Sequence, residues 1–165
     1  AVLEEEKAPL TCEFFKKMLP IKNKIIHVRW SGEAVWIPYG DTKTGLPPEN
    51  ATTYPKVGEM VLYPGGVSET EMMLAYGCCH FGSKAGELAG NHFLTVTEGK
   101  EKLMDIGREI LYNGAENVEI SIKKRPYSGL LILAEDTGLE PAGLLHLTRF
   151  PGELLSHSVN PPNFY

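Results

Sequence analysis

Hydrophobic and polar positions alternate with the two-residue period of a β-strand in several short stretches of the chain. Gly and Pro bound most of these stretches, as they commonly bound strands and mark turns. The pattern predicts a mainly β fold, and we interpret it as a small β-barrel with a groove on its outside. The predicted strands cover residues 1–3, 25–30, 33–37, 60–63, 69–76, 92–97, 118–122 and 129–134.

Two further stretches follow the 3.6-residue period of a helix. The first covers residues 4–20 and has a Pro near its start, where the missing N–H costs nothing. The second covers residues 100–112 and is followed by Asn113-Gly114, a typical helix end. The predicted apolar faces consist of Ala8, Cys12, Phe15 and Leu19 in the first helix and of Leu103, Ile106, Ile110 and Leu111 in the second.

The length of 165 residues predicts a single domain over the whole chain, 1–165. A chain of this size buries about 70% of its unfolded surface, so it needs neither a disulfide nor a metal to fold. Residues 41–56 form a long polar loop, which in compact domains is often a lid or an arm. The C-terminal tail, 151–165, has no core pattern, and we expect it to wrap the barrel or to reach a second subunit of a homodimer or larger homo-oligomer.

Charge and composition exclude several classes of function. The formal net charge is -5 and basic residues do not cluster, so no nucleic-acid partner is expected. No apolar run approaches the ~20 residues that span a membrane. The first residues are acidic, unlike a signal peptide, and three Cys do not make a disulfide framework, so we expect a cytoplasmic protein. The chain lacks nucleotide-binding loops, and no cofactor is predicted.

Three residues in the Gly-rich region 77–92 bear on metal binding and nucleophilic chemistry. Cys78 and Cys79 are adjacent, whereas zinc ligands are usually spaced by two or more residues, so no metal site is predicted. His80 follows them directly, but being next in sequence does not make it a base in contact with either thiol. We therefore expect the cysteines to be small buried residues.

His92 is the first candidate for acid–base chemistry, because it follows this Gly-rich loop at the start of a strand. Histidine exchanges protons near neutral pH, and the preceding Asn91 would offer a hydrogen bond to a ligand carbonyl. The alternative is a histidine that bonds only to the protein backbone.

Arg29 is the candidate anchor for an anion, because its planar guanidinium matches a carboxylate. Glu33 or Glu71 would orient the ligand or take a proton. The alternatives are an ordinary Arg29–Glu33 surface ion pair and a solvated strand end that carries Glu69 and Glu71. The expected aromatic walls of the site are Tyr63, Tyr76 and Phe93.

Two segments resemble cyclophilins. KAPLTCEFFKKMLP resembles their first helix, and LAGNHFLTVTEGKEKLMDIGREI resembles the segment that runs from the groove loop through a strand into the second helix. The phrases RWSGEAVWIPYGD, ENATTYP, LYPGGVSETE and GNHF make the whole chain similar to an uncharacterised bacterial and archaeal cyclophilin-like family. The resemblance implies a closed antiparallel β-barrel of about eight strands with two α-helices, a kind of fold that leaves no free sheet edge. It also places Leu88, Gly90 and His92 at groove positions.

The chain departs from the proline isomerases among the cyclophilins. Those enzymes carry a His-Arg pair followed by Phe and Gln-Gly-Gly-Asp, whereas here Val28 separates His27 from Arg29 and no Gln precedes Gly40-Asp41. Because fold alone does not assign activity, three functions are expected. The first is the binding, or the chemical conversion, of a small anionic molecule in the groove, with His92, Arg29 and Glu71 as the candidate catalytic residues. The second is peptidyl-prolyl isomerisation, and the third is a non-catalytic subunit of a homo-oligomer.

Overall fold

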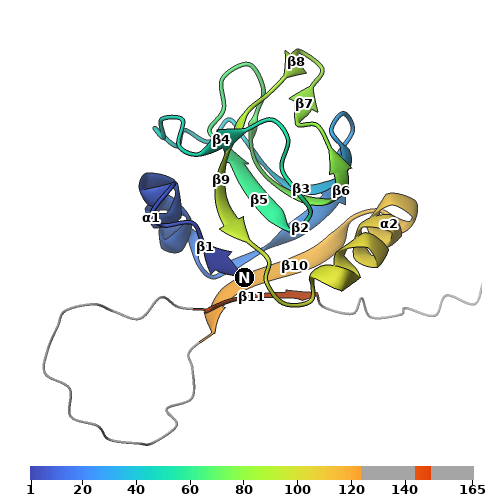
Figure 1. The fold of residues 1–165 in the computed structure, drawn as a ribbon. Coiled ribbons are helices and arrows are strands. Elements are labelled where there is room, and N and C mark those ends of the chain that lie inside the picture. The colour runs from blue at the N-terminus through green and yellow to red at the C-terminus, as the bar shows by residue number, and fades with distance from the viewer. Residues whose placement is uncertain (124–143, 150–165) are drawn as a thin grey trace, which may run out of the picture.

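The computed structural model describes residues 1–123 and 144–149 (Figure 1). Its helices are α1 (Pro9–Met18) and α2 (Leu103–Asn113), with a short 3-10 helix, η1 (Lys100–Lys102), directly before α2. Its strands are β1 (Val2–Leu3), β2 (Ile21–His27), β3 (Gly32–Gly40), β4 (Ala51–Thr52), β5 (Glu59–Tyr63), β6 (Thr70–Cys79), β7 (Gly82–Ser83), β8 (Gly86–Glu87), β9 (Gly90–Thr95), β10 (Glu116–Lys123) and β11 (Leu144–Arg149).

One curled antiparallel sheet dominates the fold. Its strands lie in the order β1-β9-β5-β6-β3-β2-β10-β11, and β4 pairs with β9 on a separate branch. Within the described residues this path stays open, because β1 and β11 come near each other at its two ends without pairing. The mainly β prediction with two helices is therefore confirmed, while the strands form an open, curled half-barrel and no closed barrel is seen.

Both faces of the central strands are buried, which explains their continuous apolar character. Side chains on one face, such as Met72 and Leu74, form one core with Phe15 of α1 and Ile110 of α2. Side chains on the other face, such as Met73, form a second core that loops cover. The face alternation predicted for residues 69–76 is thus confirmed. Since both faces are buried, most side chains on either face are apolar and few are polar.

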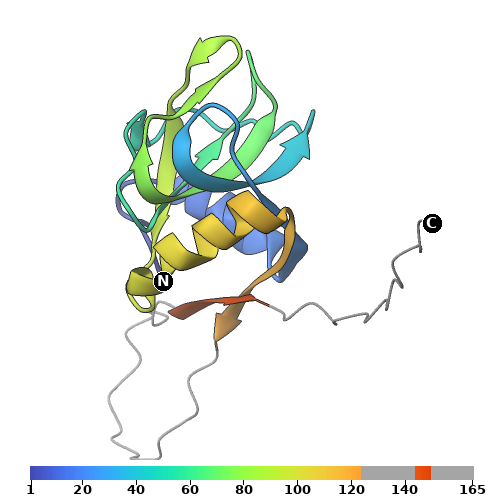
Figure 2. The same cartoon turned by 90° about the vertical axis from the view of Figure 1, so that its right-hand side faces the viewer.

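Most residues predicted for the apolar faces of the two helices are buried or pack against the core. Ala8, Cys12 and Phe15 are buried beneath α1, and Leu19 packs against the same core. In α2 the prediction is wrong for Leu111, which is 47% exposed. The aromatic ring of Tyr76 lies where a side chain on Gly107 would stand, so the helix approaches the sheet through a glycine. Figure 2 shows α2 lying across the sheet in this position.

The boundaries of several elements differ from the sequence predictions. The first helix starts at Pro9, not at residue 4, and β2 ends at His27, which leaves Arg29 in a turn. β11 lies within a stretch for which no strand was predicted. The strand predicted over 129–134 and the tail 151–165 lie outside the described residues, and the single-domain assignment stays a prediction. No helix in the described part of the chain is long and apolar enough to cross a membrane.

Candidate functional site

A small pocket lies on the sheet face that α1 and α2 do not cover. Its volume is about 130 Å³, and its walls come from the turn between β2 and β3, the start of β6 and the β7–β8 hairpin. The predicted residues Arg29 and Glu71, which are far apart in the sequence, both line it. The complete lining is Val28, Arg29, Trp30, Ser31, Trp36, Ser68, Glu69, Glu71, Gly82, Ser83 and Lys84.

Two cationic side chains line the pocket from separate segments. Arg29 stands in the turn after β2, and Lys84 stands in the turn between β7 and β8. The two turns are held together because Ser31 Oγ donates to the Gly82 carbonyl at 3.1 Å and the His80 N–H donates to the Ser31 carbonyl at 3.0 Å. Neither cation forms an ion pair within the described residues. Both charges therefore remain available to a bound anion.

Glu71 is the buried acid of the pocket. It is the second residue of β6 and is only 7% exposed. Burial raises the pKa of its carboxyl group to about 7, and the neighbouring charge of Glu69 adds to this effect. No hydrogen bond or ion pair reaches the Glu71 side chain from any residue that the structure describes. This carboxyl group can therefore gain or lose a proton near neutral pH.

Trp36 contributes a second polar group without a partner. It lies on β3, is 8% exposed and lines the pocket beside Val28. Its indole N–H finds no acceptor in the described structure, and an unpaired buried donor costs about 1–3 kcal/mol. The sequence prediction missed both Trp36 and Lys84. Strand alternation could have found Trp36, since it shares the Ala34 face, but nothing in the local sequence marks Lys84.

Glu33 and Tyr76 do not line this pocket. Glu33 accepts the Cys78 N–H at 2.7 Å, and the Arg29–Glu33 ion pair is not formed. Tyr76 lines a different, apolar pocket of about 100 Å³ beneath α2. There its hydroxyl donates to Nε2 of His27 at 2.7 Å, because Nδ1 of that ring lies 2.7 Å from the Val28 carbonyl and must carry the ring proton.

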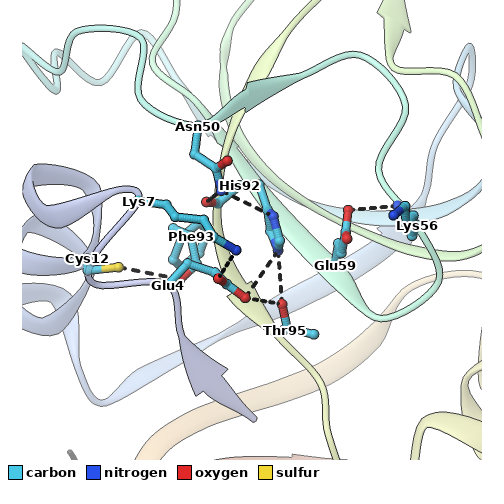
Figure 3. Close-up of polar contacts among 9 residues, drawn as sticks. All are labelled: Glu4, Lys7, Cys12, Asn50, Lys56, Glu59, His92, Phe93 and Thr95. Atoms are coloured by element: carbon cyan, nitrogen blue, oxygen red, sulfur yellow. Dashed lines mark hydrogen bonds and ion pairs between the residues drawn. The ribbon is translucent and has the colours of Figure 1, made fainter.

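His92 lies in a polar network on β9, away from the pocket lining (Figure 3). Thr95 Oγ1 donates to Glu4 Oε1 at 2.7 Å, so its single proton is used and it accepts from His92 Nε2 at 3.0 Å. Nδ1 of the ring then accepts from Asn50 Nδ2 at 3.3 Å. Lys7 Nζ completes the network with a 3.1 Å bond to Glu4. Both ring nitrogens therefore bond within the protein, but to the side chains of Thr95 and Asn50 and not to the backbone as the alternative had it.

Asn91 is fully buried and joins three parts of the chain. Its amide group donates to Thr11 Oγ1 at 3.0 Å and to the Pro47 carbonyl at 2.9 Å. Its carbonyl oxygen accepts the Glu49 N–H at 3.0 Å. The amide hydrogens that we expected to face a ligand are thus used to fasten the 41–56 loop to α1 and β9.

The predicted homo-oligomer stays a prediction.

The remaining predicted wall residues lie in the two cores. Phe93 is completely buried against Phe15, with ring centroids 4.8 Å apart. Tyr63 and Leu88 belong to the second core, on the face that carries the pocket. Tyr63 is the direct cross-strand neighbour of Glu71, so of the three it comes nearest to the site.

The adjacent cysteines lie on opposite sides of the end of β6. Cys79 is buried as predicted, but the prediction is wrong for Cys78, which is exposed because alternation along the strand turns it to the opposite side. In the described part of the chain, no three His, Cys, Asp or Glu side chains form a group that could hold a metal ion.

Comparison with known proteins gives one match. A family model described as "Protein of unknown function (DUF3830)" matches residues 1–122, which is more than half of the chain. A search of curated proteins found no match.

Proposed function

The chain belongs to the family of proteins of unknown function DUF3830, and we propose that it binds a small anionic molecule in the pocket that Arg29 and Glu71 share. One observation carries this proposal. A buried carboxyl group without a protein partner lies in the same pocket as two cations that form no ion pair within the described residues.

The balance of charge in the pocket favours an anion. When Glu71 is protonated, Arg29 and Lys84 face only one carboxylate, that of Glu69. Arginine binds carboxylates through two parallel N–H bonds, and lysine adds a point charge. The hydroxyl groups of Ser31, Ser68 and Ser83 in the lining offer further hydrogen bonds. The site is therefore suited to a carboxylate or a phosphate.

The size of the pocket limits the ligand. Pockets for drug-sized ligands measure about 300–1,000 Å³, and this one measures about 130 Å³. The bound group is therefore small, comparable to a short carboxylic acid or inorganic phosphate. His92 lies outside this pocket, so Glu71 is the acid–base group of the proposal.

Isothermal titration calorimetry with acetate, lactate, succinate and inorganic phosphate tests the proposal. We expect at least one of them to bind, and Arg29→Ala and Lys84→Ala each to weaken it about tenfold, as the loss of about 1.4 kcal/mol implies. Arg108→Ala and Lys43→Ala are the matched controls, because both residues are exposed and outside the pocket. Binding should tighten as the pH falls through about 7, where Glu71 loses its charge. Equal affinities in the pocket variants and their controls would reject the site.

One observation also favours the alternative function, peptidyl-prolyl isomerisation. Arg29 lies in the pocket together with the apolar side chains of Val28, Trp30 and Trp36, and an isomerase needs an arginine beside an apolar proline pocket. A peptide isomerisation assay decides this alternative. A catalysed rate that Arg29→Ala abolishes would support it, and a rate equal to that of the uncatalysed reaction would reject it.

A further inference from the structure

The positive and negative groups of the pocket come from different segments of the chain. Arg29 and Lys84 belong to the turn after β2 and to the β7–β8 hairpin, whereas Glu71 and Glu69 belong to the start of β6 and the loop before it. Opposite charges within about 4–6 Å would lower the pKa of Glu71. Its pKa is instead raised, by burial and by Glu69, and no described cation opposes this. The cations and the carboxylates therefore line one pocket, and no ion pair joins them within the described residues.

The Glu71 carboxyl group lacks a hydrogen-bond donor within the described residues. Buried polar groups in folded proteins nearly always have a partner, and an ionised carboxylate is costly to bury alone. The Glu71 residue is more than nine-tenths buried, and no donor among the described residues reaches its carboxyl group, which lines the pocket. A ligand that placed an N–H group against this carboxylate would supply the missing partner.

The indole N–H of Trp36 lacks a hydrogen-bond acceptor within the described residues. This N–H is buried, and the residue lines the same pocket. A carboxylate oxygen is an acceptor, and an ammonium group is a donor. A molecule with both groups would offer an acceptor to the two cations and a donor to Glu71, whereas a simple anion leaves Glu71 without a donor.

We propose, building on the anion site described above, that the ligand is a small amino acid or amino-acid-like molecule. Its carboxylate lies at Arg29 and Lys84, and its amine donates hydrogen bonds to Glu71. The pocket volume of about 130 Å³ suits a compact molecule of this class, such as glycine, alanine or β-alanine.

Matched pairs of ligands test this inference by calorimetry at about pH 8, where the pKa of about 7 leaves the Glu71 carboxyl mostly ionised. The pairs are glycine with acetate, and alanine or β-alanine with propionate. Hydrogen bonds to a charged group contribute about 1.5–3 kcal/mol, so we expect the amine-bearing member to bind about tenfold tighter or more. In Glu71→Gln this ratio should fall to about one, because the charge that binds the ammonium group is gone. Glu98→Gln, an exposed change outside the pocket, should keep the wild-type ratio.

The outcomes separate this inference from the anion site itself. If acids and amino acids bind equally well and Arg29→Ala weakens both, the anion site stands and the amino-acid assignment is overturned. If Glu71→Gln keeps the preference for the amine, the assignment is also overturned. If no member of any pair binds, both proposals fail for these ligands. Should Glu71→Gln not fold, the wild-type ratio measured from about pH 8 to about pH 5.5 replaces it, and the ratio must fall with protonation of Glu71.

Discussion

Glu49 caps the first helix through Thr11. Its carboxylate accepts the Thr11 N–H at 2.8 Å and the Thr11 hydroxyl at 2.7 Å, and it also accepts the Leu10 N–H at 3.2 Å. No side chain next to α1 in the sequence caps the helix, so a residue from the 41–56 loop does this instead. The loop is thus a structural part of the helix start, and Asn91 holds it there.

Removal of this cap should destabilise the protein. Glu49→Ala leaves two helix N–H groups without their acceptor, and losing an N-terminal cap costs about 0.5–2 kcal/mol. Urea denaturation should show this loss in the free energy of unfolding, while Glu6→Ala, an exposed change before the helix, should have little effect. Equal stability of the two variants would show that the loop does not support α1.

Stability should fall as the pH rises through the range in which Glu71 ionises. Its pKa is about 7 in the folded protein against an ordinary value of 4.5, so the folded state binds more protons between these values. Unfolding free energy therefore decreases with pH in this range. Glu71→Gln should stabilise the protein by on the order of 1–3 kcal/mol at about pH 8, and the difference should vanish below about pH 4.5. Urea titrations at several pH values check this, and a gain that is independent of pH would contradict it.

Loss of the Thr95 hydroxyl should weaken the His92 network. The hydrogen bond from Thr95 is the main cause that lowers the pKa of Glu4, and burial partly opposes it. A lowered pKa contributes stability near neutral pH, and this stability is lost as the pH falls through the folded-state pKa. Thr95→Val should therefore cost about 1–2 kcal/mol at neutral pH and less in acid. Thr97→Val, at an exposed position, is the control, and a cost that is the same at every pH would argue against the Glu4 link.

Only one of the three cysteines should react with a thiol reagent in the folded protein. Cys78 is exposed, whereas burial raises the pKa of Cys12 to about 11 and that of Cys79 to about 12. The thiolate is the reactive form, so the two buried thiols should react only after unfolding. Intact-mass spectrometry after maleimide treatment should show one adduct in wild type and none in Cys78→Ser. Rapid modification at Cys12 or Cys79 would mean that the sheet opens readily.

The sequence predicts local structure better than it predicts the site. Alternation and helical spacing identified most described strands and both helices, because burial on one face leaves a periodic trace. β11 was missed, because no strand was predicted over residues 144–149, and Arg29 was placed on a strand although β2 ends two residues earlier. Whether strands close into a barrel depends on pairing between distant segments, which local patterns do not record.

The candidate site, too, could be predicted only in part, because it depends on contacts between distant segments. Arg29 and Glu71 were chosen for their chemistry, and the fold brings both to one pocket. His92 was chosen by the same reasoning, but its ring bonds to Thr95 and Asn50 elsewhere. Lys84 joins the pocket only because the β7–β8 hairpin docks on the turn after β2. Such contacts between distant segments follow from tertiary packing.

The burial of β6 on both faces limits which amino-acid substitutions the strand can accept. Every residue from Thr70 to Tyr76 is buried, so a new polar side chain has no face of the strand on which to reach water. In a library of single substitutions, this strand should accept far fewer replacements than the β7–β8 hairpin, whose residues are half-buried in β7 and exposed in β8. Glu71 stands out in that stretch as its one ionisable carboxylic acid, at a position where folding alone would favour an apolar residue.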